Sequence, residues 1–219
     1  LAPCAEELYK AGIRRINISL DTLMPEKYAE ITRGGRLSDA LEGIRAAMAA
    51  GMSPVKLNTV LIGGFNDDEI ETLAEMTVRY PVQLRFIELM PIGNTGDFPK
   101  QAYLPDSTVL ERLPQLVPVP SEKHTVARLY RLPGAKGEVG LISPLSNHFC
   151  AECNRLRLTA DGCLKPCLHS AEELSVRGLH GEQLRQAILT AVSHKPQMHV
   201  ALSATERSEA RRSMYRIGG

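Results

Sequence analysis

The chain has 219 residues, of which 43% are hydrophobic and 23% are charged, and its formal net charge is +1. These proportions are typical of a globular protein with a sizeable core, and the small net charge argues against a nucleic-acid-binding or membrane-surface protein. Every apolar run is shorter than the roughly 20 residues that cross a bilayer, so no membrane span is expected.

The first twelve residues, LAPCAEELYKAG, are predicted to form a helix that ends at Gly12. The sequence has no initiator Met and opens within this helix. We therefore expect the chain to be part of a longer protein. The expected apolar face of the helix consists of Leu1, Ala5, Leu8 and Tyr9.

The residues from Ile13 to Leu89 alternate between strand and helix patterns. Asn66 and Glu69 have the spacing of a capping box at the start of one of the expected helices. The order strand, helix, strand, helix, strand predicts βα units with a parallel sheet, and three strands are too few to close a barrel. The expected strands are 13–20, 55–62 and 82–89, and the expected helices are 38–50 and 65–79.

The character of the sequence changes near Leu104, where we place the boundary between a first domain, 1–104, and a second domain, 105–219. The second domain is expected to be a small α+β domain. Its predicted elements are a helix at 106–113, the proline-rich connection VPVPSEK, strands at 127–133 and 138–144, a hairpin at 154–168 with the turn ADG, and an amphipathic helix at 180–195 with Leu184, Ile188 and Ala191 facing inward.

Four of the five cysteines lie within the hairpin region, at Cys150, Cys153, Cys163 and Cys167. An odd number of cysteines bunched late in a chain of this size favours a reducing compartment, and we expect a cytoplasmic protein. Thiolates are soft ligands that bind zinc or iron–sulfur clusters, and C-x-x-C spacing also occurs in redox pairs. All four cysteines could close a zinc site, whereas three would leave one coordination position of a cluster open.

Two arginines accompany these cysteines. Arg155 and Arg157 are two residues apart, so on a strand both project from the same face. A guanidinium group is always charged and binds phosphate oxygens in a forked geometry. Two guanidinium groups beside a metal site indicate a phosphorylated substrate, whereas the alternative interpretation is a solvated charged face.

The stretch HFCAECNRLRLTADGCLKPCL resembles the C-terminal cluster motif of the molybdenum-cofactor biosynthesis protein A family, the GTP 3′,8-cyclases. RINISLDTL, PVKLNTVLIGGFND, RFIELMPIGN and the terminal IGG are similar to that family in the same order. The resemblance extends over nearly the whole chain, and it would make the chain the C-terminal two-thirds of such an enzyme.

The resemblance implies a radical S-adenosylmethionine (SAM) enzyme, with the C-terminal half of an incomplete (β/α)6 barrel followed by the small cluster-binding domain. Members of the family carry two [4Fe–4S] clusters. The N-terminal cluster cleaves SAM to a radical, and the C-terminal cluster holds GTP through an open iron. The radical removes the C3′ hydrogen of GTP, and bonding of C3′ to C8 gives (8S)-3′,8-cyclo-7,8-dihydroguanosine 5′-triphosphate, a precursor of molybdopterin.

Carried over position by position, the resemblance makes Cys150, Cys153 and Cys167 the ligands of the second cluster and leaves Cys163 as a hairpin residue. It makes Arg155 and Arg157 catalytic. It also assigns SAM contacts to Ser19 and Met90, GTP contacts to Lys56, Arg155, Leu156 and Arg157, and a role in the active site to the terminal Gly218 and Gly219. Arg85 is a weaker candidate for binding SAM or the triphosphate.

The resemblance also implies partners: cyclic pyranopterin monophosphate synthase downstream, a reductase or a flavodoxin or ferredoxin as electron donor, and a possible homodimer. In a eukaryote it implies the mitochondrial matrix. The C-x3-C-x2-C motif of the first cluster is absent, and Cys4 is expected to be a buried helix residue, so we expect the chain alone to be inactive. The alternative from another class is a zinc-stabilised binding module with four cysteine ligands and a phosphorylated partner.

Overall fold

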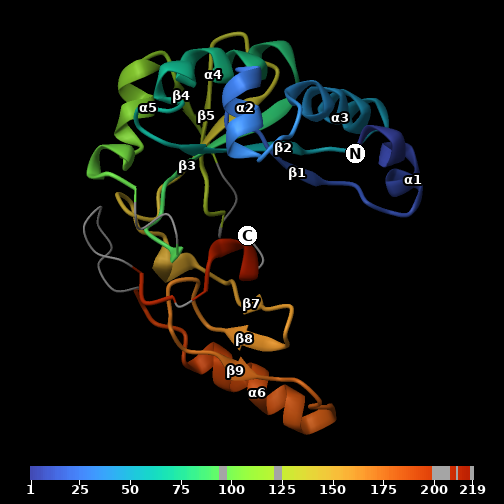
Figure 1. Cartoon of the computed structure of the whole chain (residues 1–219), viewed down its shortest axis with the longest axis vertical. Coiled ribbons are helices and arrows are strands. Elements are labelled where there is room, and N and C mark those ends of the chain that lie inside the picture. Colours follow the sequence, from blue (N-terminus) through green and yellow to red (C-terminus); the bar gives the residue numbers. More distant parts are fainter. Residues whose placement is uncertain (94–97, 121–124, 199–207, 211, 218–219) are drawn as a thin grey trace. The chain divides into compact units, whose positions relative to one another are not determined.

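The computed structural model describes residues 1–93, 98–120, 125–198, 208–210 and 212–217 (Figure 1). These residues fall into two compact units. The first consists of Leu1–Leu89 with Leu104–Ser143, and the second consists of Met90–Tyr103 with Pro144–Gly219. Residues 105–143 belong to the second domain that the sequence suggests, yet they pack with the first unit.

The first unit contains a six-stranded sheet in the order β1-β2-β3-β6-β5-β4. Four neighbouring strands are parallel, and β5 and β4 are added antiparallel at one side. The three strands expected before residue 90 are confirmed. Strand β4 lies in the proline-rich stretch expected to be a connection, and Pro118 is tolerated there because β4 is an edge strand. The strands are β1 (Ile16–Ser19), β2 (Val55–Leu61), β3 (Val82–Glu88), β4 (Val117–Val119), β5 (Arg128–Arg131) and β6 (Glu138–Ile142).

Helices cover one face of this sheet (Figure 1). The expected first helix is confirmed: it ends at Lys10, and Gly12 follows in the turn with a φ of 101°, which favours glycine. Helix α2 was not predicted, although Pro25 at its first turn is a recognisable start signal. The helical segments are η1 (Ala2–Cys4), α1 (Ala5–Lys10), α2 (Pro25–Ile31), α3 (Leu37–Ala49), η2 (Asp67–Glu69), α4 (Ile70–Arg79) and α5 (Ser107–Arg112).

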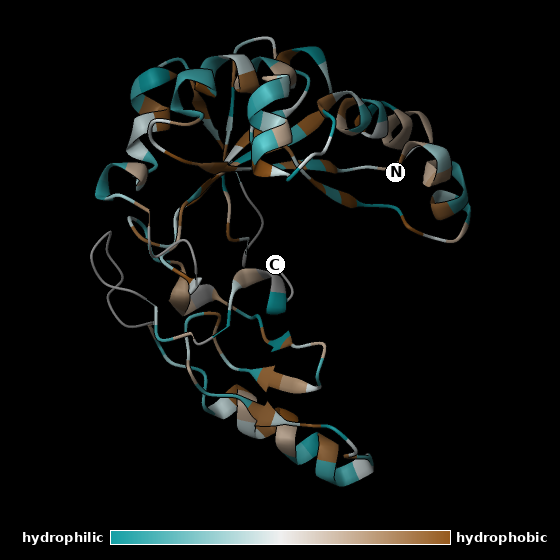
Figure 2. Ribbon diagram, in the orientation of Figure 1, coloured by the Kyte–Doolittle hydropathy of each residue, from teal (hydrophilic) through white to brown (hydrophobic). Residues whose placement is uncertain are grey.

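The core lies between the sheet and these helices. In β2 and β3 every second residue is buried, so one face of the sheet is apolar and the other carries the intervening side chains. Leu57 and Leu84 from the strands and Leu73 from α4 are fully buried in this core. Figure 2 shows hydrophobic residues along the strands and hydrophilic ones on α2 and α4.

The segment after Leu104 is tied to the ends of two sheet strands. Glu88, at the end of β3, accepts a hydrogen bond from the backbone N–H of Asp106 at 3.0 Å. The carboxylate of Asp106 in turn accepts hydrogen bonds from Arg128 and from Ser143, the residue after β6. These bonds explain why the chain returns to the first unit after leaving it at Leu89.

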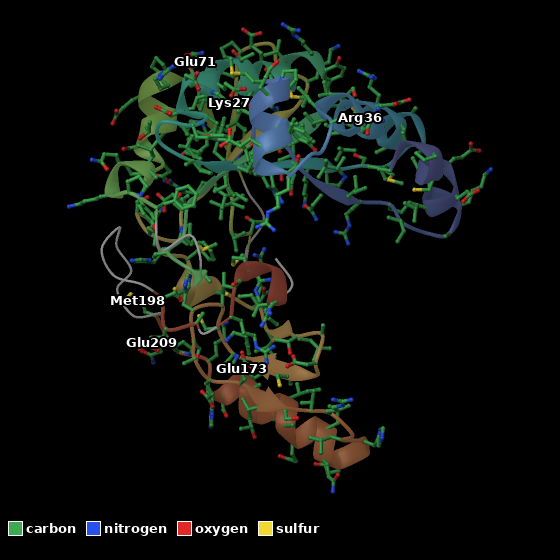
Figure 3. All side chains as sticks on the ribbon, viewed as in Figure 1. Lys27, Arg36, Glu71, Glu173, Met198 and Glu209 are labelled. Atoms are coloured by element: carbon green, nitrogen blue, oxygen red, sulfur yellow. The ribbon has the colours of Figure 1, made fainter. Side chains whose placement is uncertain are left out.

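The capping box expected at the start of α4 is wrong. Asn66 is fully buried, and its amide joins the ends of two strands: it accepts from Ile62 N at 2.8 Å and donates to Asp21 O at 2.7 Å and Val60 O at 2.9 Å. Glu69 turns away from the helix and accepts from Thr22 Oγ1, Leu23 N and Lys27 Nζ. Figure 3 labels Lys27 on α2. Both side chains therefore bond groups outside the helix end rather than capping it.

The second unit is built on a three-stranded antiparallel sheet in the order β7-β8-β9. The expected hairpin is confirmed, with Gly162 at φ 81° in its turn. The expected long helix is also confirmed, but it packs on a narrow sheet, so Ala191 is buried whereas Ile188 is 40% exposed. The elements are η4 (Lys100–Ala102), η5 (Cys150–Glu152), β7 (Arg157–Leu158), β8 (Cys163–Lys165), β9 (Leu174–Ser175), α6 (Gly181–Ser193) and η6 (Met214–Arg216).

The protein is therefore a mixed α/β protein whose larger sheet is mainly parallel. Within the described ranges, the helices are too short or too polar for any of them to cross a membrane.

Replacing Asn66 by Ala should lower the free energy of unfolding by about 2–4 kcal/mol, because three hydrogen bonds are lost and buried backbone groups are left without partners. Urea unfolding followed by circular dichroism measures this difference. Glu75→Ala is the control, since it removes only an exposed pair with Arg79 and should cost less than about 1 kcal/mol. Equal stability of the two variants would contradict the bridging role of Asn66.

Candidate functional site

The face of the larger sheet opposite the core carries polar side chains in two rows across the strands. Parallel register places Ser19 beside Asn58 and Asn58 beside Arg85. One step earlier, Lys56 lies beside Gln83. Ser19 ends β1, as predicted, and it is exposed. The first unit therefore brings Ser19, Lys56 and Arg85 onto one face of the sheet. Ser19 and Arg85 lie in the same row, and Lys56 lies in the row two residues earlier.

Asn58 is a residue of this face that the sequence reasoning missed. Among the described residues, its Oδ1 is the buried side-chain polar atom that has no hydrogen-bond partner. A buried amide oxygen without a partner is costly, and such atoms commonly face a ligand or water. The signal in the sequence was a second polar residue two positions after Lys56 in an otherwise apolar strand.

Arg85 is held across the sheet by its neighbours. Its Nε donates to Gln83 at 2.8 Å, and Gln83 donates to Glu138 on β6 at 3.1 Å. Gly140 is the register partner of Arg85, and a Cβ there would lie 3.2 Å from Arg85 Cγ. The missing side chain at Gly140 leaves room for the stem of Arg85 across the sheet face.

Met90 lies two residues beyond the end of β3 and belongs to the second unit. It is partly buried, and its carbonyl accepts a hydrogen bond from Ile92 N at 2.8 Å. It was expected to end the strand, whereas the strand ends at Glu88.

The first two cysteines of the hairpin region share one helical turn. Cys150 begins η5, and the N–H of Cys153 donates to its carbonyl at 3.1 Å. In a 3₁₀ turn, residues three apart lie on the same side. The local backbone thus brings both residues of the C-x-x-C pair to one side of the turn.

Cys163 and Cys167 are separated by strand β8. Cys163 is the first residue of the strand, and its backbone is locked to Thr159 across the hairpin turn: Cys163 N donates to Thr159 Oγ1 at 2.9 Å, and Cys163 O accepts from Thr159 N at 2.9 Å. The strand then runs away from the turn toward Cys167. The strand ends at Lys165, so Cys163 belongs to the hairpin, whereas Cys167 lies beyond it.

Lys195, which follows α6, joins the two cysteine segments. Its ammonium group lies 3.5 Å from Cys153 Sγ, 2.9 Å from Arg155 O and 3.2 Å from Pro166 O. Pro166 directly precedes Cys167, so one side chain contacts both segments that carry proposed ligands. The sequence reasoning missed Lys195, because only the fold brings residue 195 back to residues 153–166.

Arg157 lies close to both arginine and cysteine neighbours. Burial lowers the pKa of its guanidinium, and the positive charge of Arg155 lowers it further, while negative charge at Cys153 and Cys167 would raise it. Arg155 precedes β7 and is exposed, whereas Arg157 begins the strand and is partly buried. The second unit therefore brings the two arginines together with two of the predicted cysteine ligands.

The remaining candidates lie elsewhere. Gly218 and Gly219 are outside the described residues, but the carbonyl of Ile217 just before them accepts a hydrogen bond from Arg157 at 3.3 Å. Cys4 ends η1 and is partly exposed rather than buried, and its thiol donates to Leu1 O at 3.2 Å. Leu156 is partly buried between the two arginines.

The cysteine thiols of the second unit are the type of ligand that an iron–sulfur cluster requires. All five cysteines are free thiols of intermediate exposure, and soft thiolates are the usual ligands of such clusters. Over the described ranges, no group of three His, Cys, Asp or Glu side chains is gathered closely enough to hold a metal ion. The assignment of a cluster to these cysteines therefore rests on their thiol ligands and on Lys195, which contacts both Cys153 and the residue before Cys167.

Two family models match the chain. One is Molybdenum Cofactor Synthesis C, over residues 82–201, and the other is the Radical SAM superfamily, over residues 3–77. The GTP 3′,8-cyclase of Alkaliphilus oremlandii is 48% identical over 98% of this chain and 68% of its own length. The chain belongs to the GTP 3′,8-cyclase family of radical SAM proteins.

Other members of the GTP 3′,8-cyclase family are equally similar. The protein of that name from Alkaliphilus metalliredigens is 50% identical over 98% of this chain, and the one from Peptoclostridium acidaminophilum is 47% identical over all of it. In each case the match covers 68% of the relative's length.

Replacing Lys195 by Met should loosen both cysteine segments, because three contacts of one ammonium group are lost. We expect amide hydrogen exchange at Cys153, Arg155 and Cys167 to become about tenfold faster, the effect of roughly 1.4 kcal/mol. Lys100→Met, at an exposed position of the same unit, is the control. Unchanged exchange in the Lys195 variant would show that its contacts do not hold these segments.

Proposed function

We propose that this chain supplies the SAM-facing strands, the second cluster site and most of the GTP site of a GTP 3′,8-cyclase in molybdenum cofactor biosynthesis. Such an enzyme converts GTP to (8S)-3′,8-cyclo-7,8-dihydroguanosine 5′-triphosphate. The observation that carries the proposal is the position of Arg157, which lies within electrostatic range of Arg155, Cys153 and Cys167. A phosphate-binding group beside soft metal ligands is the combination that this reaction requires.

In this proposal Cys150, Cys153 and Cys167 hold a [4Fe–4S] cluster. When bound, the cluster supplies an iron with an open position for an atom of the substrate. The protein groups supply the rest of the site: the 3₁₀ turn presents two thiolates from one side, and Lys195 keeps the segment before Cys167 next to them. Three ligands, with Cys163 left in the hairpin, agree with the lock between Cys163 and the turn.

GTP binding is assigned to Arg155, Leu156 and Arg157, and the resemblance adds Lys56. The guanidinium groups would bind triphosphate oxygens, and the partly buried Arg157 would hold its charge in a fixed place. Gly218 and Gly219 would complete this site, as the resemblance implies. The hydrogen bond from Arg157 to the carbonyl of Ile217 supports that assignment, because it places the residue before the two glycines beside a residue proposed to bind GTP.

SAM binding is assigned to Ser19 and Met90, with Arg85 as a weaker candidate. The unpaired Oδ1 of Asn58, next to Ser19 in the sheet, supports a ligand on this face. We also propose that the parallel strands of the larger sheet belong to an incomplete (β/α)6 barrel. The functional division would then be a barrel part, residues 1–104, and a cluster and GTP part, residues 105–219.

The proposed reaction implies several partners. Its product would pass to cyclic pyranopterin monophosphate synthase, and its electrons would come from a reductase or from a flavodoxin or ferredoxin. We place the protein in the cytoplasm, or in the mitochondrial matrix of a eukaryote, with a homodimer as its possible assembly.

Cysteine replacements test the cluster assignment. In the chain reconstituted anaerobically with iron and sulfide, Cys167→Ser should lose most bound iron, because a proposed ligand is removed, whereas Cys163→Ser should retain it. Iron and zinc analysis with absorption spectroscopy provides the measurement, and Cys4→Ser is the control.

The reverse result, with iron lost in Cys163→Ser and retained in Cys167→Ser, would overturn the assignment. Zinc in place of iron, lost in both Cys163→Ser and Cys167→Ser, would instead support the zinc-stabilised binding module.

Replacing Arg155 or Arg157 by Ala should weaken GTP binding to the cluster-loaded chain about 10- to 100-fold, because each guanidinium can make a charge-assisted bond worth about 1.5–3 kcal/mol. Isothermal titration calorimetry measures the affinity. Arg185→Ala, on the exposed face of α6, should leave it unchanged. An arginine whose loss has no effect would belong to a solvated face.

A further inference from the structure

The C-terminal segment of the second unit packs against residues 91–93 of the same unit. Ser208 N donates to Pro91 O at 3.0 Å, and a Cβ on Gly93 would lie 2.9 Å from Ser213 Cα. After the short turn η6, Ile217 is completely buried. The described residues of this segment are therefore packed in place rather than frayed, which is unusual for the end of a chain.

Arg212 makes the most extensive contacts of this segment. Its Nε donates to both carboxylate oxygens of Glu173, at 2.8 and 2.9 Å, and Nη2 donates to Glu173 Oε2 at 2.7 Å. Its Nη1 and Nη2 also donate to the two carboxylate oxygens of Asp161, at 3.0 and 2.8 Å. One planar guanidinium thus bridges the turn of the cysteine hairpin and the segment before β9. Figure 3 labels Glu173 in this region.

Both carboxylates also bond residues other than Arg212. Lys165 in β8 is completely buried, and its ammonium group donates to Ser170 O at 2.6 Å and contacts Glu173 Oε1 at 3.3 Å. Asp161 accepts a third hydrogen bond, from Thr159 Oγ1 at 2.6 Å. Positive and negative groups therefore alternate from Lys165 through Glu173 and Arg212 to Asp161, and Arg212 joins a prearranged pair of acceptors.

Asp161, Glu173 and Arg212 stay charged near neutral pH. The bonds from Arg212 and Thr159 lower the pKa of Asp161 to about 2, and the bond from Arg212 lowers that of Glu173. The same carboxylates raise the pKa of Arg212. A carboxylate with a lowered pKa loses its interaction only as the pH falls through that pKa, so the contacts persist over the physiological range.

The far end of the segment is fixed at Arg157. Five residues after Arg212, the carbonyl of Ile217 accepts the hydrogen bond from Arg157 Nη1. The stretch from Arg212 to Ile217 is thereby attached at both ends to the hairpin that carries Cys163 and leads to Cys167. The charged contact at Arg212 is the stronger attachment, because it is bidentate to two carboxylates.

We propose that Arg212 is a positioning residue that latches residues 212–217, the tail, onto the cysteine hairpin and so holds Ile217 beside Arg157. The proposal deepens the proposed function and rests on it for the role of the final glycines. Arg212 itself touches neither cysteine nor substrate in this account, and it acts through the tail that it holds. Asp161 and Glu173 are the acceptors of the latch.

Amide hydrogen exchange in the whole chain tests the latch. Arg212→Gln should make exchange at Met214, Arg216 and Ile217 at least tenfold faster, whereas amides of β8 change less. Arg212→Lys should give an intermediate rate, because a lysine restores the charge without the fork. Arg185→Lys, at an exposed position of α6, is the matched control and should leave the tail unchanged.

Asp161→Asn supplies a second variant at an exposed turn, for the case that Arg212→Gln unfolds the hairpin. The effects of Asp161→Asn and Arg212→Gln on tail exchange should be less than additive, because each removes the same contact. Unchanged tail exchange in either variant would overturn the latch. Equal acceleration throughout the tail and β8 would also overturn it, since that pattern shows general destabilisation of the unit.

Turnover separates the latch from the proposed function. Because this chain lacks the motif of the first cluster, turnover is measured in a longer enzyme in which the C-x3-C-x2-C segment precedes it. In that enzyme, reconstituted with both clusters, SAM, reductant and GTP, Arg212→Gln should lower kcat at least tenfold while KM for GTP and iron content stay unchanged. An unchanged kcat with a loosened tail would overturn the positioning role. If the unaltered enzyme forms no cyclised nucleotide, the proposed function fails, and the exchange measurements alone decide whether the latch exists.

Discussion

Parallel, in-register pairing of β1, β2 and β3 is the constraint on which the first unit depends. Side chains on a strand alternate between the two faces, so the register that buries Leu57 and Leu84 under the helices also places Lys56, Asn58 and Arg85 on the opposite face. A slip of one residue would expose the core and bury the charges. The amide of Asn66, which joins the ends of β1 and β2, helps to hold this register.

The second unit is held together by a different kind of interaction. Its strands have two or three residues each, too few to bury much apolar surface, and α6 leaves Leu189 and Val192 about half exposed. Basic side chains make the long-range connections instead: Lys165 and Arg212 bind carboxylates, and Lys195 binds two carbonyls and contacts a thiol. Because a buried charge such as Lys165 is costly without a partner, these contacts specify one arrangement of the loops.

This difference suits the chemistry proposed for each unit. A sheet face offers fixed positions for groups that bind a cofactor in the same orientation every time. Loops held by ionic contacts leave thiols accessible: all four cysteines of the hairpin region are partly exposed, although their segments are tied down. A site that binds a cluster and a nucleotide, as proposed, needs both accessible donors and little freedom of movement.

Local sequence patterns determined most of the elements of this protein, though not α2 or β4, and the kinds of donor in its candidate site. Alternation in VKLNTVLI and VQLRFIEL and the turn ADG depend only on neighbouring residues, so they were readable in advance. The tertiary structure alone decided what each polar residue contacts. Asn66 and Glu69 have the spacing of a helix cap, yet Thr22 and Leu23, which lie 47 and 46 residues earlier in the sequence, bond Glu69 in place of the helix end. Lys195 and Arg212 carry no local signal, because their partners lie 29 to 51 residues earlier and only folding brings them together.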